Sequence, residues 1–427
     1  MRTYDAVIFD LDGTLTDSKP GIIESTEYAL RKMGFPVPGD AILQKFLGPP
    51  LAESFMRYCG MNEAQAAQAT DYYRETYSPG GWKNNAVYPR IRALLSALRD
   101  RGVFLAVATG KPTINARKIL DYFDLLRYFD AVSGPEMGDL HADKGALIRK
   151  VLPGGKRAVM VGDTAGDVIG ARETGIDSVA ALYGYGDDEE VLAAKPTYAV
   201  KDTEALCRLL CPDMPEAKGY FVTFEGVDGC GKSTQIAAME KRLTQFGYTV
   251  RRTREPGGCP ISEEIRKIVL AKEDGGMCPE TEALLFAAAR AQHVKDVILP
   301  GVRAGEIVLC DRFVDSSMVY QGSARGLSRD WVREINLAAF REGAPDATVY
   351  LRMSHSEALR RRLSASDPDR IEQMGDSFQA HTEAGYEELY RENPGRFVAV
   401  NAAQTPEAVT EEAFQALYAR LMKEGVL

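Results

Sequence analysis

The stretch that decides the fold of the second half of the chain is Phe224-Glu225-Gly226-Val227-Asp228-Gly229-Cys230-Gly231-Lys232-Ser233-Thr234. It follows the apolar run 219–224 and opens a segment whose apolar side chains recur at helical spacing. The order is therefore strand, glycine-rich turn and helix. In such a loop the backbone N–H groups wrap a phosphate chain, the lysine reaches the outer phosphates and the serine hydroxyl binds Mg²⁺. The sequence thus predicts a nucleotide-phosphate site at Gly226, Gly229, Gly231, Lys232, Ser233 and Thr234.

The composition is that of a folded protein with more than one domain. A length of 427 residues exceeds one ordinary core and indicates two or three domains. The net charge of −9 argues against a nucleic-acid partner or an acidic membrane surface. No apolar stretch approaches the roughly 20 residues that span a bilayer. Because Asp5 and Asp10 interrupt the first apolar run, we expect no signal peptide.

The seven cysteines are odd in number and scattered, and no two form a Cys-x-x-Cys pair. This pattern is typical of reduced thiols, so we expect a cytoplasmic protein. The four histidines show no metal-binding spacing, which gives no indication of a zinc site.

The first half begins with a short apolar run, 4–9, that ends in Asp10-Leu11-Asp12-Gly13-Thr14. Residues 19–82 are helical in pattern and contain no convincing strand. Strand and helix patterns then alternate, with strands at 103–108, 129–133, 158–161 and 178–182. This order predicts a parallel sheet with a helical insertion directly after its first strand.

Two of these strands, like the first apolar run, end in polar residues that suit phosphate chemistry. Thr109-Gly110-Lys111 follows one strand, Asp163 and Asp167 follow another, and Lys144 opens a helical run between them. In a phosphate-ester hydrolase one Asp attacks phosphorus and a neighbouring Asp serves as acid and base. The hydroxyl and the lysine hold phosphoryl oxygens, and the later acids bind Mg²⁺. Alone, however, Asp-x-Asp-Gly-Thr would also fit a plain turn.

Together these residues resemble the haloacid dehalogenase-like phosphatases, whose four motifs are present in order over about residues 1–210. The resemblance implies a Rossmann-like phosphatase domain at 1–212 with a small helical cap at about 18–84. Asp10 would be the nucleophile, Asp12 the general acid and base, and Thr109 and Lys144 the phosphate binders. It also implies a magnesium site made by Asp10, Asp12, Asp163 and Asp167.

The cap loop Gly48-Pro49-Pro50-Leu51 resembles that of the phosphoglycolate phosphatase and 5′-nucleotidase branch. Lys144 is followed by Gly145 and not by the proline common in phosphoglycolate phosphatases. This departure favours nucleotide 5′-phosphates as substrates. Phosphoglycolate, another small phosphate ester, and a regulatory module without catalysis are the alternatives.

Segment 213–218 is the predicted linker, since prolines 212 and 215 flank or interrupt it and it lacks apolar periodicity. Beyond the phosphate loop, Arg254-Glu255-Pro256-Gly257-Gly258 follows a strand pattern, and so does Asp311-Arg312. Phe286 and Arg290 lie four apart on the helical segment 279–299. By spacing alone they would be a core Phe and a surface Arg.

These motifs resemble thymidylate kinases over residues 219–427, in order and through the whole second half. The resemblance implies a P-loop nucleoside monophosphate kinase fold, ATP and Mg²⁺ at Lys232, Ser233 and Thr234, and a homodimer. Catalysis would involve Lys232, Arg312 and Arg370, the last from a lid at about 360–376. The implied dTMP site comprises Asp228, Arg254, Phe286, Arg290, Arg312, Ser317 and Tyr320.

Three positions depart from the thymidylate kinase pattern. Ala289 stands where Asp usually precedes Arg290, so we expect Arg290 to lack an orienting partner. Cys259 replaces the usual Thr, and the lid lacks a basic residue at 364–367. Overall we expect an α/β enzyme of two three-layer parallel-sheet domains, a phosphatase followed by an ATP:dTMP kinase. A kinase for another nucleoside monophosphate is the alternative for the second half.

Overall fold

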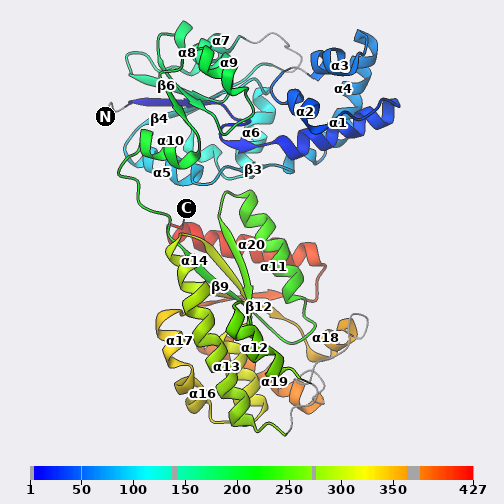
Figure 1. The fold of residues 1–427 in the computed structure, drawn as a ribbon, viewed down its shortest axis with the longest axis vertical. Helices are drawn as coiled ribbons and strands as arrows, with labels where there is room; N and C mark the ends of the chain where they lie inside the picture. Colours follow the sequence, from blue (N-terminus) through cyan, green and yellow to red (C-terminus); the bar gives the residue numbers. More distant parts are fainter. Residues whose placement is uncertain (1–3, 50, 137–142, 272–275, 363–375, 427) are drawn as a thin grey trace. The chain divides into compact units, whose positions relative to one another are not determined.

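The computed structural model describes residues 4–49, 51–136, 143–271, 276–362 and 376–426. The chain forms two compact units (Figure 1), Met1–Pro215 with Gln245–Gly247, and Glu216–Thr244 with Tyr248–Leu427. The break after Pro215 falls within the segment 213–218 that we propose as a linker. In the described ranges, no helix is both long enough and apolar enough for a membrane crossing.

The first unit is built on a parallel sheet with the strand order β5-β4-β1-β6-β7-β8 in the described residues. Its central strand β1 is buried along its whole length, as expected for a parallel strand covered on both faces. The predicted parallel sheet is therefore confirmed. The strands are β1 (Ala6–Phe9), β4 (Phe104–Ala108), β5 (Ala131–Ser133), β6 (Ala158–Gly162), β7 (Asp177–Ala181) and β8 (Tyr198–Val200).

Helices cover both faces of this sheet. Figure 1 shows α7, α8 and α9 on one side and α5 and α10 on the other. On the first side Leu147 and Ile148 of α7 pack against Ile8, Ala106 and Met160 of the sheet. The helices are α5 (Ile91–Asp100), α6 (Thr113–Tyr122), α7 (Lys144–Val151), α8 (Ala165–Glu173), α9 (Asp188–Ala193) and α10 (Thr203–Leu210), with a 3₁₀ turn at η3 (Leu126–Tyr128).

The predicted helical insertion lies between β1 and β4 and has a core of its own, which includes Phe46, Phe55 and Tyr73. The chain enters it through β2 (Thr16–Asp17) and leaves it through β3 (Ala86–Val87), and these two strands pair antiparallel. The inserted helices are α1 (Lys19–Met33), α2 (Asp40–Leu43), α3 (Leu51–Cys59) and α4 (Glu63–Tyr77), with 3₁₀ turns η1 (Gln44–Phe46) and η2 (Gly81–Lys83). We call this insertion the cap.

The second unit has a parallel sheet with the order β10-β11-β9-β12-β13 in the described residues. Phe221 of the central strand β9 packs with η4 and α17 on one face. Its neighbours Tyr220 and Val222, which point to the other face, are equally buried. The strands are β9 (Tyr220–Glu225), β10 (Val250–Arg254), β11 (Ile307–Asp311), β12 (Ala347–Arg352) and β13 (Phe397–Asn401).

The helical segment predicted at 279–299 is not one regular helix. It is an α-helix to His293, then a π-helical turn, then a second short α-helix. The helices are α11 (Lys232–Gln245), α12 (Pro260–Val269), α13 (Pro279–His293), η4 (Val294–Ile298), α14 (Leu299–Arg303), α15 (Val314–Ser317), η5 (Met318–Ala324, also π-helical), α16 (Arg329–Ile335), α17 (Leu337–Glu342), α18 (His355–Arg362), α19 (Asp376–Glu392) and α20 (Pro406–Lys423).

Candidate active sites

The predicted phosphatase residues lie at one edge of the first sheet. Asp10 follows β1, Thr109 follows β4 and Asp163 follows β6, three adjacent strands that run in parallel. Their carboxyl ends therefore meet at the same edge, where open α/β sheets bind ligands. Lys144 begins α7 and Asp167 lies in the first turn of α8, so both reach the same place.

Three buried carboxylates gather there around one ammonium group. Asp10, Asp163 and Asp167 each offer an oxygen within 4.8 Å of the others. Lys144 Nζ lies 3.1 Å from Asp10 Oδ1 and 2.6 Å from Asp167 Oδ1. Burial, opposed by Lys144, raises the pKa of Asp10 to about 6, and burial with the nearby Asp10 carboxylate raises the pKa of Asp163 to about 7.

This cluster fits a divalent cation. When all three carboxylates are ionised, they outweigh the single ammonium group by two negative charges in a largely buried site, which is costly without a further positive charge. Carboxylate oxygens are the ligands that Mg²⁺ prefers. Among the described residues, no group donates a hydrogen bond to the buried Oδ1 of Asp12 beside the cluster.

Neighbouring groups fix the two later acids. Thr14 Oγ1 donates to Asp163 Oδ1 (3.0 Å), and the Tyr185 N–H donates to Asp163 Oδ2 (2.8 Å). The Thr164 hydroxyl donates to Asp167 Oδ2 (2.7 Å) within the capping box at the N-terminus of α8. Gly13 has φ +78°, and a Cβ on it would lie 2.2 Å from Asp163 Oδ2, so glycine is needed here.

Lys111 and Tyr77 join this site although neither is among the predicted site residues. Lys111 Nζ lies 2.9 Å from Asp12 Oδ2 and donates to the hydroxyl of Tyr77, at the end of cap helix α4 (3.0 Å). The Lys111 N–H donates to Thr109 Oγ1 (3.2 Å). Lys111 was visible in the sequence next to Thr109, whereas nothing in a helical Tyr marks Tyr77. The cap and the sheet thus meet at the predicted acid–base residue.

The glycine-rich loop follows β9 as the sequence predicts. Lys232 is buried and its Nζ donates to the carbonyl oxygens of Gly226 and Val227, both at 3.0 Å. Gly226 has φ +146°, and a Cβ there would lie 2.8 Å from the Leu351 carbonyl oxygen. The loop therefore needs glycine at 226 to pass close to β12.

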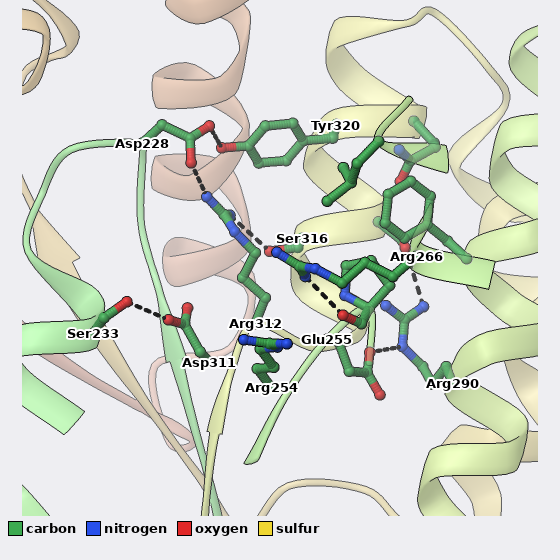
Figure 2. Close-up of a pocket in the computed structure, with 15 residues that line it drawn as sticks. Asp228, Ser233, Arg254, Glu255, Arg266, Arg290, Asp311, Arg312, Ser316 and Tyr320 are labelled. Carbon is green, nitrogen blue, oxygen red and sulfur yellow. Dashed lines mark hydrogen bonds and ion pairs between the residues drawn. The ribbon is translucent and has the colours of Figure 1, made fainter. Parts of the chain in front are cut away.

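A pocket of about 260 Å³ lies beside this loop (Figure 2). It unites eight of the predicted residues: Asp228, Ser233, Arg254, Phe286, Arg290, Arg312, Ser317 and Tyr320. Gly226, Gly229, Gly231, Lys232 and Thr234 form or follow the loop without lining this pocket. Arg370 and most of the predicted lid at 360–376 lie outside the described residues.

Asp228 connects the loop to the strand end of β11. It pairs with Arg312, and its Oδ2 accepts a hydrogen bond from the Tyr320 hydroxyl (2.7 Å, Figure 2). Arg312 also donates to Ser316 Oγ (3.1 Å) and lies over the Tyr320 ring at 4.9 Å. Arg254, by contrast, is largely exposed and pairs with Glu263 of α12.

Arg290 is buried, and the expectation that it lacks an orienting partner is wrong. Its Nε donates to Glu255 Oε2 (2.6 Å), and its Nη1 donates to Ser317 Oγ (3.0 Å) and Asn336 Oδ1 (2.5 Å). Its Nη2 donates to the Phe313 carbonyl (3.1 Å). Glu255, from the loop after β10, thus orients this arginine without help from position 289.

The burial that helical spacing predicts for Phe286 and Arg290 on α13 is also wrong. Phe286 is half-buried and lines the pocket, whereas Arg290 is only 2% exposed. Leu284 and Ala288, two apolar side chains four positions apart on the same helix, are exposed. The helix instead turns Glu282 and Arg290 inward, toward polar partners that the local sequence does not reveal.

Seven further residues line the pocket without being among the predicted site residues: Glu255, Pro256, Arg266, Leu270, Asp311, Ser316 and Gln321. Asp311 Oδ2 accepts a hydrogen bond from Ser233 Oγ (2.9 Å), which brings a carboxylate to the end of the phosphate loop. Its position at a strand end was a readable signal. Arg266 lies on an exposed amphipathic helix, where an arginine is ordinary, and donates to the Pro256 carbonyl (2.7 Å).

Known proteins match the two halves separately. The sequence model of the thymidylate kinase family matches residues 224–413, and that of the haloacid dehalogenase-like hydrolases matches residues 7–181. A thymidylate kinase of Pelobacter propionicus is 45% identical over 199 residues, across 45% of this chain and 91% of that protein. One of Thermomicrobium roseum is 44% identical over 207 residues, across 48% and 97%.

The solved structures that match about half of the chain include two phosphatases. A putative phosphatase from Clostridium difficile is 39% identical, with a TM-score of 0.46, and covers 49% of this chain and 100% of that one. A predicted phosphatase from Clostridium acetobutylicum is 40% identical, with the same TM-score and coverage.

The kinase relatives correspond to this chain over nearly their full length, and the aligned region includes the loop and the pocket described above. The hydrolase match spans the strands that carry Asp10, Thr109 and Asp163. The chain therefore belongs to the thymidylate kinase family through its second half, which is joined to a haloacid dehalogenase-like hydrolase domain in its first half.

Proposed function

We propose that residues 219–427 transfer the γ-phosphoryl group of ATP to dTMP and release dTDP and ADP. The observation that carries this proposal is the pocket beside the phosphate loop. It is lined by Ser233 and the guanidinium groups of Arg254 and Arg312, and also by the aromatic ring of Phe286 and the buried Arg290. The relatives described above are named thymidylate kinases, and these names support the same substrate.

We assign recognition of the thymine base to side chains on α13 and η5. The four hydrogen bonds of Arg290 use four of its five N–H groups, and we assign the fifth, on Nη2, to the O4 carbonyl of thymine. Gln321 Nε2 donates to Glu282 Oε1 (3.1 Å), so its carbonyl oxygen is the group that accepts the thymine N3–H. Phe286 offers its ring face for stacking.

Phosphoryl transfer needs positive charge and a dry, ordered site. Arg312 and Arg254 bind the acceptor phosphate, with Arg266 as an addition from α12. Lys232 binds the outer phosphates of ATP, and Ser233 with Asp311 would hold Mg²⁺. When bound, Mg²⁺ neutralises charge on the phosphate oxygens. Arg370 is the proposed catalytic arginine of the lid.

The test is ADP formation by the Asp10→Asn protein with ATP, Mg²⁺ and a panel of nucleoside monophosphates. This substitution removes the proposed phosphatase nucleophile, so that acceptors are not consumed. We expect turnover of dTMP above all others, and its loss when Lys232→Ala is added. A preference for another nucleotide would replace the proposed acceptor, and no turnover with any would refute the kinase proposal.

We propose that residues 1–212 hydrolyse phosphomonoesters through an aspartyl-phosphate on Asp10. Asp10 attacks phosphorus, Asp12 protonates the leaving oxygen and then takes a proton from the attacking water, and Thr109 and Lys144 hold the phosphoryl oxygens. Asp163 and Asp167, with Asp10 and Asp12, would hold Mg²⁺, which supplies charge neutralisation. The buried acid cluster with Lys144 carries this proposal.

The substrates that we propose for this domain are nucleotide 5′-phosphates. The test is phosphate release by wild-type protein from nucleoside monophosphates, phosphoglycolate and sugar phosphates, with Mg²⁺ or with EDTA. We expect nucleotides to be cleaved only with Mg²⁺, and not by Asp10→Asn. Cleavage of phosphoglycolate alone would refute the nucleotide assignment, and release that persists in Asp10→Asn would refute the mechanism.

We also propose a homodimer through the kinase unit and a cytoplasmic location. Ile261 and Ile268, seven residues apart on α12, and Leu284 on α13 are 55%, 52% and 49% exposed, which is costly for large apolar side chains in water. All seven cysteines are free thiols. Light scattering should give a dimer for wild type and a monomer for Ile268→Glu; a monomeric wild type would refute the dimer.

A further inference from the structure

Two helices that line the kinase pocket are joined by a ladder of polar contacts. On α13, Glu282, Phe286 and Arg290 follow at intervals of four and so share one face. Arg290 contacts Ser317, while Glu282 contacts Gln321 and Arg325 at the other end of the facing segment. The aromatic ring between them lies in the pocket. The contacts at Glu282 serve no role in the phosphoryl transfer described above.

Glu282 is the buried centre of these contacts. Its side chain is 2% exposed, and its Oε2 accepts from Arg325 Nη2 at 2.7 Å. Its Oε1 accepts from Gln321 Nε2 at 3.1 Å and from Arg325 Nε at 3.3 Å. An ionised carboxylate only accepts hydrogen bonds. Gln321 must therefore turn its NH₂ group toward Glu282, and its carbonyl oxygen is left for the pocket.

We propose that Glu282 is a positioning residue that sets base specificity by fixing the orientation of the Gln321 amide. Arg325 holds the carboxylate in place, and the carboxylate holds the amide. This inference rests on the proposed function, in which Gln321 faces the base. It adds a residue that does not itself line the pocket.

The fixed amide discriminates between pyrimidines at their N3 position. Thymine and uracil carry an N3–H donor and an O4 acceptor, which match the Gln321 carbonyl and an Arg290 N–H. Cytosine carries an N3 acceptor and an N4 amino donor. Its N3 would face the Gln321 carbonyl, acceptor against acceptor, and its amino group would face the Arg290 N–H, donor against donor. Buried polar groups left without partners are what allow a site to reject an analogue strongly.

The variant Glu282→Gln should reverse this orientation. Arg325 only donates hydrogen bonds, and its shorter contact, from Nη2 (2.7 Å), will claim the oxygen of the new amide at the present Oε2 position, at the cost of its longer contact from Nε to Oε1 (3.3 Å). The new NH₂ group will then face Gln321, whose carbonyl must turn toward it. Gln321 will present its own NH₂ group to the base, which suits the N3 acceptor of cytosine and opposes the N3–H of thymine.

The experiment measures kcat/KM for dTMP, dUMP and dCMP in the Asp10→Asn background, with and without Glu282→Gln. We expect the kcat/KM values for dTMP and dUMP to fall together. The ratio of kcat/KM for dTMP to that for dCMP should fall by at least about tenfold. KM for ATP should not change. Because a specificity ratio does not depend on the fraction of folded enzyme, a merely structural role would leave it unmoved.

Two further variants sharpen the test. Glu306→Gln is the matched control, since Glu306 also accepts two hydrogen bonds from one arginine, Arg251, but does not line the pocket. It should leave all ratios as in wild type. In a Gln321→Leu protein, adding Glu282→Gln should not change the dTMP-to-dCMP ratio further, because the amide through which Glu282 acts is gone.

The outcomes separate this inference from the function on which it rests. If the protein is active and Glu282→Gln lowers kcat/KM equally for all three nucleotides, this inference alone is overturned. A change in ratio that persists in the Gln321→Leu protein would also overturn it. A protein with Glu282 intact that does not phosphorylate dTMP would overturn the proposed function, and this inference with it.

Discussion

Replacing Arg290 by Met should unfold the kinase unit at much lower denaturant concentration than any surface arginine substitution. The guanidinium is 2% exposed, and the Glu255 carboxylate that it pairs with is 3% exposed. Without Arg290, the remaining side-chain partner of Glu255 described here is His293, at 3.0 Å. Removing one partner of a buried ion pair leaves an uncompensated charge and costs about 3–5 kcal/mol. With a urea slope of about 2 kcal/mol/M, the midpoint should fall by roughly 1.5–2.5 M.

The assay can be confined to the kinase unit because the chain has only two tryptophans. Trp331 lies on α16 of this unit, so a Trp82→Phe background leaves Trp331 fluorescence as its reporter. Arg251→Met is the control, since the Arg251 side chain is 45% exposed in its pair with Glu306. Exposed pairs contribute less than about 1 kcal/mol. Adding Glu255→Gln to Arg290→Met removes the unpaired charge and should recover part of the stability.

Two results would refute this reasoning. The first is a midpoint for Arg290→Met that matches the Arg251→Met control, which would mean that water or another group compensates Glu255. The second is a further loss of stability when Glu255→Gln is added, since the two substitutions would then act independently and not through one pair.

Three other perturbations test separate parts of the chain. Asp10→Asn should lower hydrolysis of p-nitrophenyl phosphate by at least about 10³-fold and leave ADP formation intact, because an amide is a poor nucleophile; equal loss of both activities would contradict separate sites. Gly226→Ala should destabilise the kinase unit by about 2 kcal/mol, because of its φ of +146° and the Leu351 carbonyl 2.8 Å from a Cβ; an unchanged Trp331 transition would contradict this. Burial and the Asp315 carboxylate raise the pKa of Glu225 to about 7, so the folded state binds a proton more tightly than the unfolded state, whose Glu pKa is about 4.3. Stability should therefore fall as pH rises from 5 to 7, and Glu225→Gln should remove up to about 1.4 kcal/mol per pH unit of that slope in urea unfolding; equal slopes would exclude this titration.

The positions of the chemical groups at strand ends were predictable because parallel strands deliver their carboxyl ends to one edge. Asp10, Thr109 and Asp163 follow strands that the apolar runs indicate, and these strands prove adjacent. The three-residue strand β8 was not among the predicted strands, although β5, which is equally short, was. For β13 the apolar run 397–401 is readable, but it lies outside the predicted strands.

The surroundings of Arg290 could not be predicted in the same way. Its partner Glu255 lies 35 positions earlier in the chain and Asn336 lies 46 positions later. Helical spacing reports which residues share a face, and it contains no information on distant loops. The same limit explains why Tyr77 was not predicted, since its contact with Lys111 spans 34 positions between the cap and the sheet.

The pairing of β2 with β3 has a consequence for how this enzyme's specificity can change. The chain enters the cap at Thr16–Asp17 and leaves it at Ala86–Val87, and the two crossings are hydrogen-bonded neighbours. Because the two ends of the cap are held together by this pairing, the distance between them does not depend on the length or sequence of the cap. A foreign cap grafted between Asp17 and Ala86 would keep Asp10, Thr109, Lys144 and Asp163 in register. The cap can thus be exchanged at a single place in the fold, provided that the new cap keeps a partner for Lys111 where Tyr77 now stands.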